Sequence, residues 1–325
     1  MTILSLGLAY RTRIDMKLAH TYSLRTQAHY LALGGLERLR TLIDQGELTA
    51  QSVAWKCSFS GNMRAEKLVE LAGSESGSVM SLSYTLRDEK AYLNVCKSDP
   101  AVWLNLPEVD AALQASVIDW IDEDDDAGPD GAEENFYLSL QKPHAAKNMP
   151  VILMRELLFI KGISLGQYVG EDLNRNLVLD ENERDGDVTR PTDNADGTLD
   201  LGLVDLFSVF GDNGKLNINT ACPLLLSALP GIGQEAAEAV ARYRAGADMI
   251  IGTDDDMYFS TVDDYGNVEG LSELHAELLG QYCCFSSDVF RAFSHARVGL
   301  VECCFMATII YSDGKAQIVS VERLI

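Results

Sequence analysis

Residues 211–244 read Gly-Asp-Asn-Gly-Lys-Leu-Asn-Ile-Asn-Thr-Ala-Cys-Pro-Leu-Leu-Leu-Ser-Ala-Leu-Pro-Gly-Ile-Gly-Gln-Glu-Ala-Ala-Glu-Ala-Val-Ala-Arg-Tyr-Arg, and the rest of the chain is organised around them. The alternation of Leu216 and Ile218 with asparagines predicts a short, half-buried strand. Thr220 is placed to cap a following helix. The turn Pro230–Gly233 predicts a tight connection to a second, alanine-rich helix, because glycine adopts backbone angles that other residues resist. The stretch therefore predicts a helix-hairpin-helix unit.

A weaker copy of this unit lies upstream. Lys90–Val95 resembles Lys215–Thr220, and a Leu-Pro pair follows both segments at about the same distance. Downstream, residues 154–163 resemble residues 261–271. Two copies are too few for a solenoid. We therefore expect two related units that pack on each other.

The overall composition restricts the class of protein. With 325 residues the chain is long enough for two domains. Its 49 acidic residues against 26 basic ones give a net charge of −23, which repels phosphate backbones and anionic lipid and attracts cations or basic partners. The seven cysteines form no C-x-x-C pair, which argues against a zinc ribbon.

The order of hydrophobic patterns predicts an α+β fold. Apolar residues at spacings of three and four predict one long helix that ends near Gln45. Strand patterns follow, and Arg87–Lys90 is interpreted as a hairpin turn between two of them; Ser312–Lys315 is interpreted as the last hairpin turn. The expected parts are a long helix over 1–50, the first part of a sheet over 51–96, a helical insert over 97–285, and the second part of the sheet over 286–325.

The sharpest local pattern is a twelve-residue acidic loop. Oxygen-bearing side chains occupy positions 1, 3, 5, 9 and 12 of it: Asp172, Asn174, Asn176, Asp180 and Glu183. Val178 at position 7 would supply its backbone carbonyl, as in an EF-hand-type calcium loop. Leu177 stands where such loops usually have glycine, and a solvated acidic loop is the alternative. The pattern predicts a calcium site, which we name the first calcium loop.

A second, more degenerate match follows. Asn194, Asp196 and Asp200 fall at positions 3, 5 and 9 of the same pattern, whereas positions 1 and 12 hold Thr192 and Leu203. These three residues are candidates for a second calcium site, with a chance match as the alternative. The acidic run at residues 122–126 is interpreted as a solvated turn, with a single ligand to a nearby ion as the further possibility.

Two other functional classes, nucleic-acid-binding proteins and enzymes, are possible for a chain with these motifs. A helix-hairpin-helix nucleic-acid-binding protein is the alternative function, but the predicted hairpin is followed by Glu235 and Glu238, with Arg242 and Arg244 as the only nearby cations. An enzyme is the other alternative. Gly231–Ala236 resembles a dinucleotide fingerprint, but a helix precedes it in place of a strand, and no G-x-S-x-G, P-loop or H-E-x-x-H motif occurs. We therefore expect neither nucleic-acid binding nor catalysis.

Four stretches carry a resemblance to a known family: Ala28–Glu37, Val117–Asp122, Lys215–Thr220 and Ser286–Arg291. In them the chain resembles the minor pseudopilin K family of bacterial type II secretion systems. The resemblance implies a pilin-like fold, in which a long N-terminal helix packs on an antiparallel sheet and a large α-helical domain is inserted between strands. It further implies calcium binding, a position at the tip of the periplasmic pseudopilus with minor pseudopilins I and J, and a role in protein export across the outer membrane.

The same resemblance implies an inner-membrane protein with a periplasmic globular domain. Members of the family begin with a leader and a full hydrophobic stretch, whereas Met1–Tyr10 resembles only the second half of that stretch, and a bilayer span needs about 20 apolar residues. We therefore expect membrane contact only through the N-terminal helix of a full-length chain. A periplasmic location permits disulfides, and Cys57 with Cys96 is the pair to inspect first, with buried free thiols as the alternative.

Overall fold

The computed structural model describes residues 2–45, 80–106, 109–172, 179–188, 192–211, 213–251, 253 and 255–324. The chain divides into two compact units. The first consists of Met1–Val53, Met63–Arg87 and Asp288–Ile325, and the second consists of Ala54–Asn62 and Asp88–Ser287. Residues 88–96 belong to the second unit. The predicted four-part division remains a prediction.

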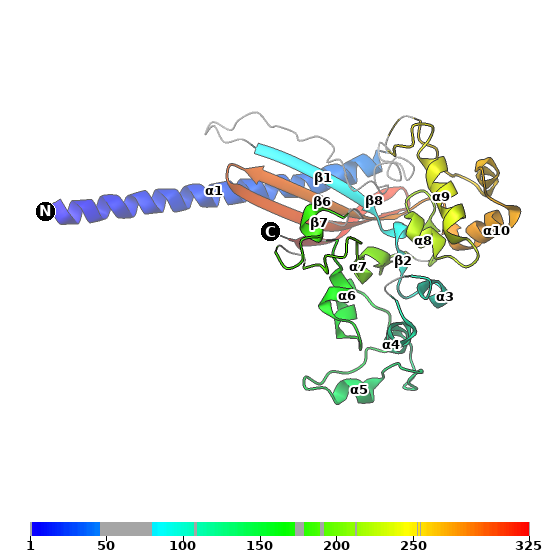
Figure 1. Ribbon diagram of the computed structural model, residues 1–325. Helices are drawn as coiled ribbons and strands as arrows, with labels where there is room; N and C mark the ends of the chain where they lie inside the picture. Colours follow the sequence, from blue (N-terminus) through cyan, green and yellow to red (C-terminus); the bar gives the residue numbers. More distant parts are fainter. Residues whose placement is uncertain are drawn as a thin grey trace. The chain divides into compact units, whose positions relative to one another are not determined.

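The first unit is a long helix on a sheet (Figure 1). Helix α1 spans Thr2–Asp44 and packs on the last three strands of a sheet with the order β1-β6-β7-β8. The strands are β1 (Met80–Asp88), β6 (Val289–Val298), β7 (Val301–Ser312) and β8 (Lys315–Arg323). Pairing is antiparallel between β6 and β7 and between β7 and β8. This arrangement confirms the prediction of a long N-terminal helix on an antiparallel sheet.

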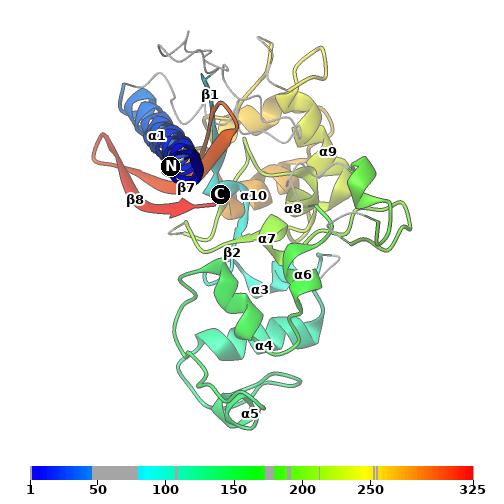
Figure 2. The ribbon, with the colours of Figure 1, turned by 90° about the vertical axis from the view of Figure 1, so that its left-hand side faces the viewer.

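Small residues bring the second half of α1 close to the sheet, as the view along the helix in Figure 2 shows. Ala28, Ala32 and Leu36 recur at a spacing of four residues, so they share one helix face, and each is at most 1% exposed. Gly35 lies on the same side, where a Cβ would come within 2.2 Å of the Ser294 hydroxyl oxygen. A larger residue at position 35 would therefore force the Ser294 side chain to move.

The turn between β7 and β8 is the predicted one. Ser312 pairs with Lys315, and the two residues between them, Asp313 and Gly314, have φ angles of 52° and 75°. Positive φ at both central residues is the geometry of a type I′ turn, which matches the twist of the flanking strands. The hairpin prediction for residues 312–315 is confirmed.

The second unit is built from short helices and very short strands. The helices that the structure describes in it are α3 (Pro100–Trp103), α4 (Ala111–Ile121), α5 (Glu134–Leu138), α6 (Leu165–Val169), α7 (Leu203–Leu206), α8 (Pro223–Ser227), α9 (Gly233–Arg244) and α10 (Glu273–Tyr282). The 3-10 turns are η1 (Glu89–Ala91), η2 (Met154–Phe159), η3 (Glu181–Glu183) and η4 (Val262–Asn267). The strands are β2 (Leu93–Asn94), β3 (Phe207–Ser208), β4 (Leu216–Asn217) and β5 (Cys283–Cys284). One apolar core, which includes Trp103, Leu157, Leu225 and Val240, joins these elements.

Strand pairing shows that the unit is internally duplicated. β2 pairs in parallel with β3, and β4 pairs in parallel with β5. The side chain of Asn94 accepts a hydrogen bond from the N–H of Cys96 (2.8 Å), and the side chain of Asn217 accepts the matching bond from the N–H of Asn219 (3.0 Å). Both asparagines are buried, so the recurring Leu-Asn pair marks the start of each copy.

The second recurring segment also has the same local structure in both copies. In η2 the Glu156 carboxylate accepts the N–H of Leu153 (3.0 Å), and in η4 the Asp264 carboxylate accepts the N–H of Thr261 (2.8 Å). Each acid therefore closes the first turn of its 3-10 segment, as in a capping box. The predicted duplication is confirmed at both segments.

The hairpin turn predicted at Arg87–Lys90 is wrong. Asp88 and Glu89 are each 2% exposed, and β2 pairs with β3 instead of folding back on β1. The Asp88 carboxylate accepts hydrogen bonds from Asn217 (2.7 Å) and Thr220 (2.6 Å), and the Glu89 carboxylate accepts one from the Ser208 hydroxyl (2.6 Å). These charged residues resemble an exposed turn in the sequence. They can be buried because both carboxylates accept hydrogen bonds from polar side chains far away in the chain.

Candidate functional site

The first calcium loop belongs to an acidic segment, residues 171–201, whose two ends meet closely. Gly170 and Leu201 form an isolated antiparallel bridge, and a Cβ on Gly170 would lie 2.2 Å from the backbone nitrogen of Gly202. The N–H of Glu171 donates to the carbonyl of Asp200 (2.8 Å). Glycine at both ends therefore closes the segment into a long loop that departs from and returns to one place.

Three of the six predicted ligands of the first calcium loop can be placed. Asn174, Asn176 and Val178 lie outside the described residues. Asp172 and Glu183 are each 1% exposed, and Asp180 donates its N–H to the Glu183 carboxylate (3.0 Å). Carboxylate oxygens are the ligands that calcium prefers in proteins. Calcium at this loop remains a prediction.

The residues of the predicted second calcium site do come together. The Asn194 amide donates to the Asp200 carboxylate (3.0 Å), and Asp196 donates its N–H to the side-chain oxygen of Asn194 (2.9 Å). The hydroxyl of Thr198 donates to Asp196 (2.5 Å), and this bond lowers the pKa of Asp196. These bonds shape a tight polar loop, and calcium at this place also remains a prediction.

Sequence reasoning missed Glu171, which organises that second loop. Its carboxylate is 6% exposed and accepts the backbone N–H groups of Asn194 (2.9 Å) and Asp200 (3.1 Å). Burial, followed by the nearby Glu171 charge, raises the pKa of Asp200. In the sequence, Glu171 stands directly before Asp172, the first predicted calcium ligand. Nothing else in the sequence distinguishes Glu171 from the other acidic residues nearby.

A different acidic group is the most compact one among the residues that the structure describes. Asp122, Asp124 and Glu133 each offer a carboxylate oxygen, and the three oxygens lie within 4.8 Å of one another. Asp122 follows α4 directly, and Glu133 is the residue before α5. Residues 123–126 are exposed, as a solvated turn requires, but Asp122 is half-buried and lies against Glu133. The solvated turn thus covers residues 123–126 but not Asp122, and a ligand role for this run remains a prediction.

Glu133 is the unusual member of this group. It is 5% exposed, and neither of its carboxylate oxygens has a hydrogen-bond partner. Burial, followed by the charges of Asp119 and Asp122, raises the pKa of Glu133 to about 7. Burial, followed by the charge of Asp124, also raises the pKa of Asp122. The neighbouring carboxylates therefore disfavour the charged form of Glu133, and its burial adds to this effect.

One of the two arginines near the predicted hairpin is buried, so it cannot contact a nucleic-acid phosphate. Arg244 is 4% exposed and donates to the carbonyls of Ile218 (2.9 Å) and Ala221 (2.7 Å), and burial lowers the pKa of Arg244 to about 10. Arg242 is exposed, and Glu238 lies 3.9 Å from it. Helices α8 and α9 pack on each other, but one buried arginine and one exposed arginine beside a glutamate do not make the basic surface that phosphate contacts need. The helix-hairpin-helix assignment remains a prediction.

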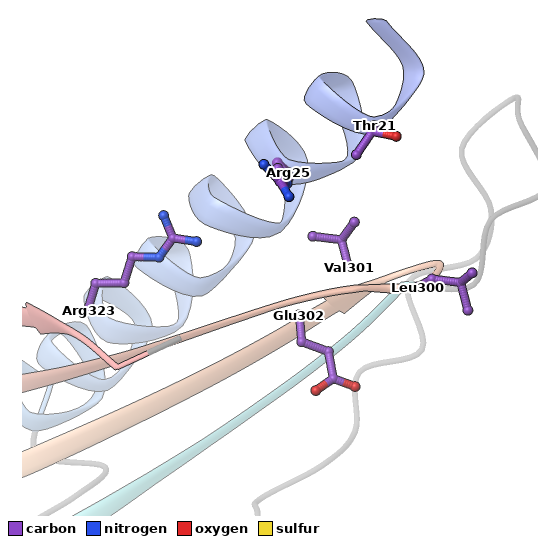
Figure 3. Close-up of a pocket in the computed structure, with 6 residues that line it drawn as sticks. All are labelled: Thr21, Arg25, Leu300, Val301, Glu302 and Arg323. Carbon is purple, nitrogen blue, oxygen red and sulfur yellow. The ribbon is translucent and has the colours of Figure 1, made fainter. Parts of the chain in front are cut away.

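A pocket in the first unit lies beside α1 and the β6–β7 turn (Figure 3). It is lined by Thr21, Arg25, Leu300, Val301, Glu302 and Arg323. The Thr21 hydroxyl donates to the carbonyl of Lys17 (2.9 Å), as helical threonines often do, and Leu300 is 93% exposed. These side chains have no part in either predicted calcium site.

Among the residues that the structure describes, no helix is both long enough and apolar enough to cross a bilayer.

Comparisons with known proteins support the resemblance stated above. Residues 103–169 match the sequence family described as "Type II secretion system (T2SS), protein K". The fold is similar to a chain in the crystal structure of the GspK-GspI-GspJ complex from the enterotoxigenic Escherichia coli type 2 secretion system, with a TM-score of 0.50 and 18% identity over 97% of this chain and 99% of that chain. No curated protein matches the sequence. The family match and the structural match confirm the resemblance to type II secretion minor pseudopilin K.

Proposed function

We propose that this pseudopilin K-like chain is a structural minor pseudopilin of a type II secretion system, without enzymatic activity, that stands at the tip of the pseudopilus and takes part in protein export across the outer membrane. The observation that carries the proposal is the match of residues 103–169 to the protein K family. That segment lies inside a large insert between strands β1 and β6, and β1 and β6 belong to one sheet that is packed on a long N-terminal helix.

The free half of α1 supports assembly with other pseudopilins. Up to about residue 27 the described side chains of α1 are almost all exposed, and Figure 1 shows this half extending past the sheet. Apolar and aromatic side chains are among them, including Leu8 (67% exposed), Tyr10 (70%) and Tyr22 (65%). Exposed apolar side chains on a helix of this length favour burial against other helices. We propose the corresponding helices of minor pseudopilins I and J as the partners.

The size of the insert supports a terminal position. Residues 88–287 make up most of the second unit, whereas the pilin-like unit has one helix and one four-stranded sheet. A filament grows by stacking similar subunits, and a subunit with a large additional domain does not present the same surface to a further copy. The insert would therefore stop addition of another subunit and leave this chain at the tip.

Calcium is proposed to order the long acidic loop. Residues 171–201 contain many carboxylates, and two of them, Asp172 and Glu183, are buried. A calcium ion coordinated by several of these oxygens would tie distant parts of the loop together, because calcium takes six to eight oxygen ligands. We propose one calcium ion in the first calcium loop and a second at Asn194, Asp196 and Asp200.

The proposed location is the inner membrane, through the N-terminal helix of a full-length chain, with the globular units in the periplasm. A disulfide between Cys57 and Cys96 would be consistent with that compartment. Cys57 lies outside the described residues, and the Cys96 sulfur accepts the N–H of Val151 (3.2 Å). Cys96 is a free thiol in the structure, which favours the alternative of free cysteines over the disulfide.

Co-purification with minor pseudopilins I and J of the same system tests the proposed role. The tagged full chain, in calcium, is expected to retain both partners. Serine substitutions at Leu18 and Tyr22, which are 51% and 65% exposed, should reduce this retention without changing the melting temperature of the isolated chain. If the intact chain retains neither partner in the presence of calcium, the tip role is wrong.

A further inference from the structure

We infer that the segment between α4 and α5 is a divalent-cation site of its own, with the carboxylates of Asp122, Asp124 and Glu133 as ligands and calcium as the ion. This site is separate from the first calcium loop and from residues 194–200. The inference does not depend on the proposed role in secretion. It rests on the geometry of the three carboxylates and on the burial of one of them.

The first argument is that Glu133 has no partner within the protein. Its side chain is 95% buried, since 5% of it is exposed, and both carboxylate oxygens lack a hydrogen bond. One oxygen of Asp122 is likewise buried without a partner. Buried carboxylates are normally paired or bound to a metal, because an isolated buried charge costs several kcal/mol. The two acids are therefore close to each other, and these buried oxygens have no hydrogen-bond partner in the protein.

The second argument is the spacing of the ligand oxygens. One oxygen from each of Asp122, Asp124 and Glu133 lies within 4.8 Å of the other two. Calcium binds oxygen at about 2.3–2.6 Å, so two ligands on opposite sides of the ion are about 4.6–5.2 Å apart and adjacent ligands are closer. Three oxygens with this spacing can share one ion. Oxygen-only ligands are the set that hard cations such as calcium prefer.

The third argument is that the surrounding chain holds the acids in place. Asp119, one turn before Asp122 on α4, is 4% exposed and accepts the N–H of Gly128 (3.1 Å). A Cβ on Gly131 would lie 1.9 Å from the Asp119 carboxylate, so glycine is required there. Asp119 is thus a positioning residue, which fixes the returning loop and with it Glu133.

Two more contacts fix the loop from outside. The Asn148 amide donates to the carbonyl of Asp124 (3.1 Å) and to the carboxylate of Asp125 (3.2 Å). The Lys161 ammonium donates to the carbonyls of Asp130 and Gly131 at 3.0 and 2.9 Å. The largest charge effects on Glu133 all come from carboxylates, so this lysine does not supply the missing positive charge. Asp124 is exposed, which gives an ion access from solvent.

Terbium luminescence tests the site directly. Terbium is a hard trivalent ion that replaces calcium at oxygen sites and emits when a nearby tryptophan is excited. Trp120 lies on α4 between Asp119 and Asp122. Chelator-treated full-length chain should therefore show emission on addition of terbium, and calcium should displace it. Trp120→Phe should remove the emission while calcium binding measured by calorimetry persists.

The matched pair of variants is Glu133→Gln and Glu134→Gln. Both remove one carboxylate, but Glu133 is buried in the cluster and Glu134 is exposed. Glu133→Gln should weaken terbium and calcium binding by at least about tenfold, because calcium affinity follows the number of charged ligands, and Glu134→Gln should bind like the wild type. Asp124→Asn, at an exposed position, supplies a second ligand variant if Glu133→Gln fails to fold.

The outcomes separate this site from the first calcium loop. Asp172→Asn should leave the emission beside Trp120 unchanged, so failure of the first calcium loop does not affect the result. Equal affinity of the wild type and Glu133→Gln, or of the wild type and Asp124→Asn, would overturn the inference and leave Glu133 as a buried, protonated acid. Displacement by magnesium but not by calcium would overturn the assignment of the ion.

Discussion

Two adjacent glycines in α1 provide a matched test of how closely the helix packs on the sheet. Gly34 is exposed and a Cβ there would meet nothing within 4 Å. Gly35 is buried, and a Cβ there would lie 2.2 Å from the Ser294 Oγ and 3.1 Å from a methyl carbon of Leu82. The substitutions Gly34→Ala and Gly35→Ala therefore make the same chemical change at an exposed and at a buried position of one helix.

The expected magnitudes follow from two opposing effects. Alanine in place of glycine inside a helix stabilises by about 0.5–1 kcal/mol, so Gly34→Ala should raise the stability by that amount. At Gly35 the same gain is opposed by overpacking of about 1–3 kcal/mol, since the Ser294 oxygen must move by about 1.2 Å to reach ordinary contact. We expect the two variants to differ by about 2 kcal/mol, or about 4–8 °C in melting temperature.

Thermal melts of both variants, followed by circular dichroism, check this expectation. Ser294→Ala supplies the control, because the Ser294 hydroxyl is 0% exposed and its oxygen has no partner, so its removal alone should be nearly neutral or stabilising. Combined with Gly35→Ala, it should restore about 1 kcal/mol, a coupling that independent sites would not show. If Gly35→Ala melts as high as Gly34→Ala, α1 does not pack on the sheet as described.

Three further predictions concern the second unit. Calcium should raise the melting temperature of the wild type, and Asp172→Asn should reduce this rise while Glu181→Gln, at an exposed position, leaves it unchanged. Burial acts to raise the pKa of Glu156, but hydrogen bonds from a lysine and from two backbone N–H groups outweigh it and hold the pKa below its ordinary value of 4.5. Its stabilising contribution should therefore be complete above about pH 4.5 and decline as the pH falls through the lower folded value, and pH-dependent melts of Glu156→Gln should lack that part of the decline. Arg244→Ala should destabilise by at least about 2 kcal/mol in denaturant unfolding, because two buried carbonyls lose a charged donor, whereas Arg242→Ala should change little; equal effects would contradict the buried role of Arg244.

Parts of the fold that depend on short stretches of chain were predictable. The helix that ends at Asp44 follows from apolar residues at helical spacing, and the β7–β8 turn follows from Asp313-Gly314. The duplication was visible because the Leu-Asn pairs form the same local hydrogen bonds in both copies. Each of these features depends on neighbours within a few residues, which the sequence displays directly.

Pairing between distant segments was not predictable in the same way. Leu93 pairs with Phe207 and Leu216 pairs with Cys283, and nothing local in these two-residue strands identifies their partners. From local patterns alone, Leu93 is predicted to pair with the preceding strand through a hairpin turn at Arg87–Lys90, and this prediction is wrong. The error arose because Asp88 and Glu89 look like turn residues until their buried hydrogen-bond partners are known.

The sequence by itself determined where acidic side chains concentrate, and the tertiary structure alone decided which of them are buried. The loop at residues 171–201 and the run after α4 are both rich in acidic residues. Only the loop contains the spacing of oxygen-bearing residues that predicts an EF-hand-type calcium site. Glu171 and Glu133 emerged only from the structure, as acids 6% and 5% exposed. The physical reason is that spacing along the chain fixes local geometry, whereas burial of a carboxylate depends on which distant segments fold against it and exclude water.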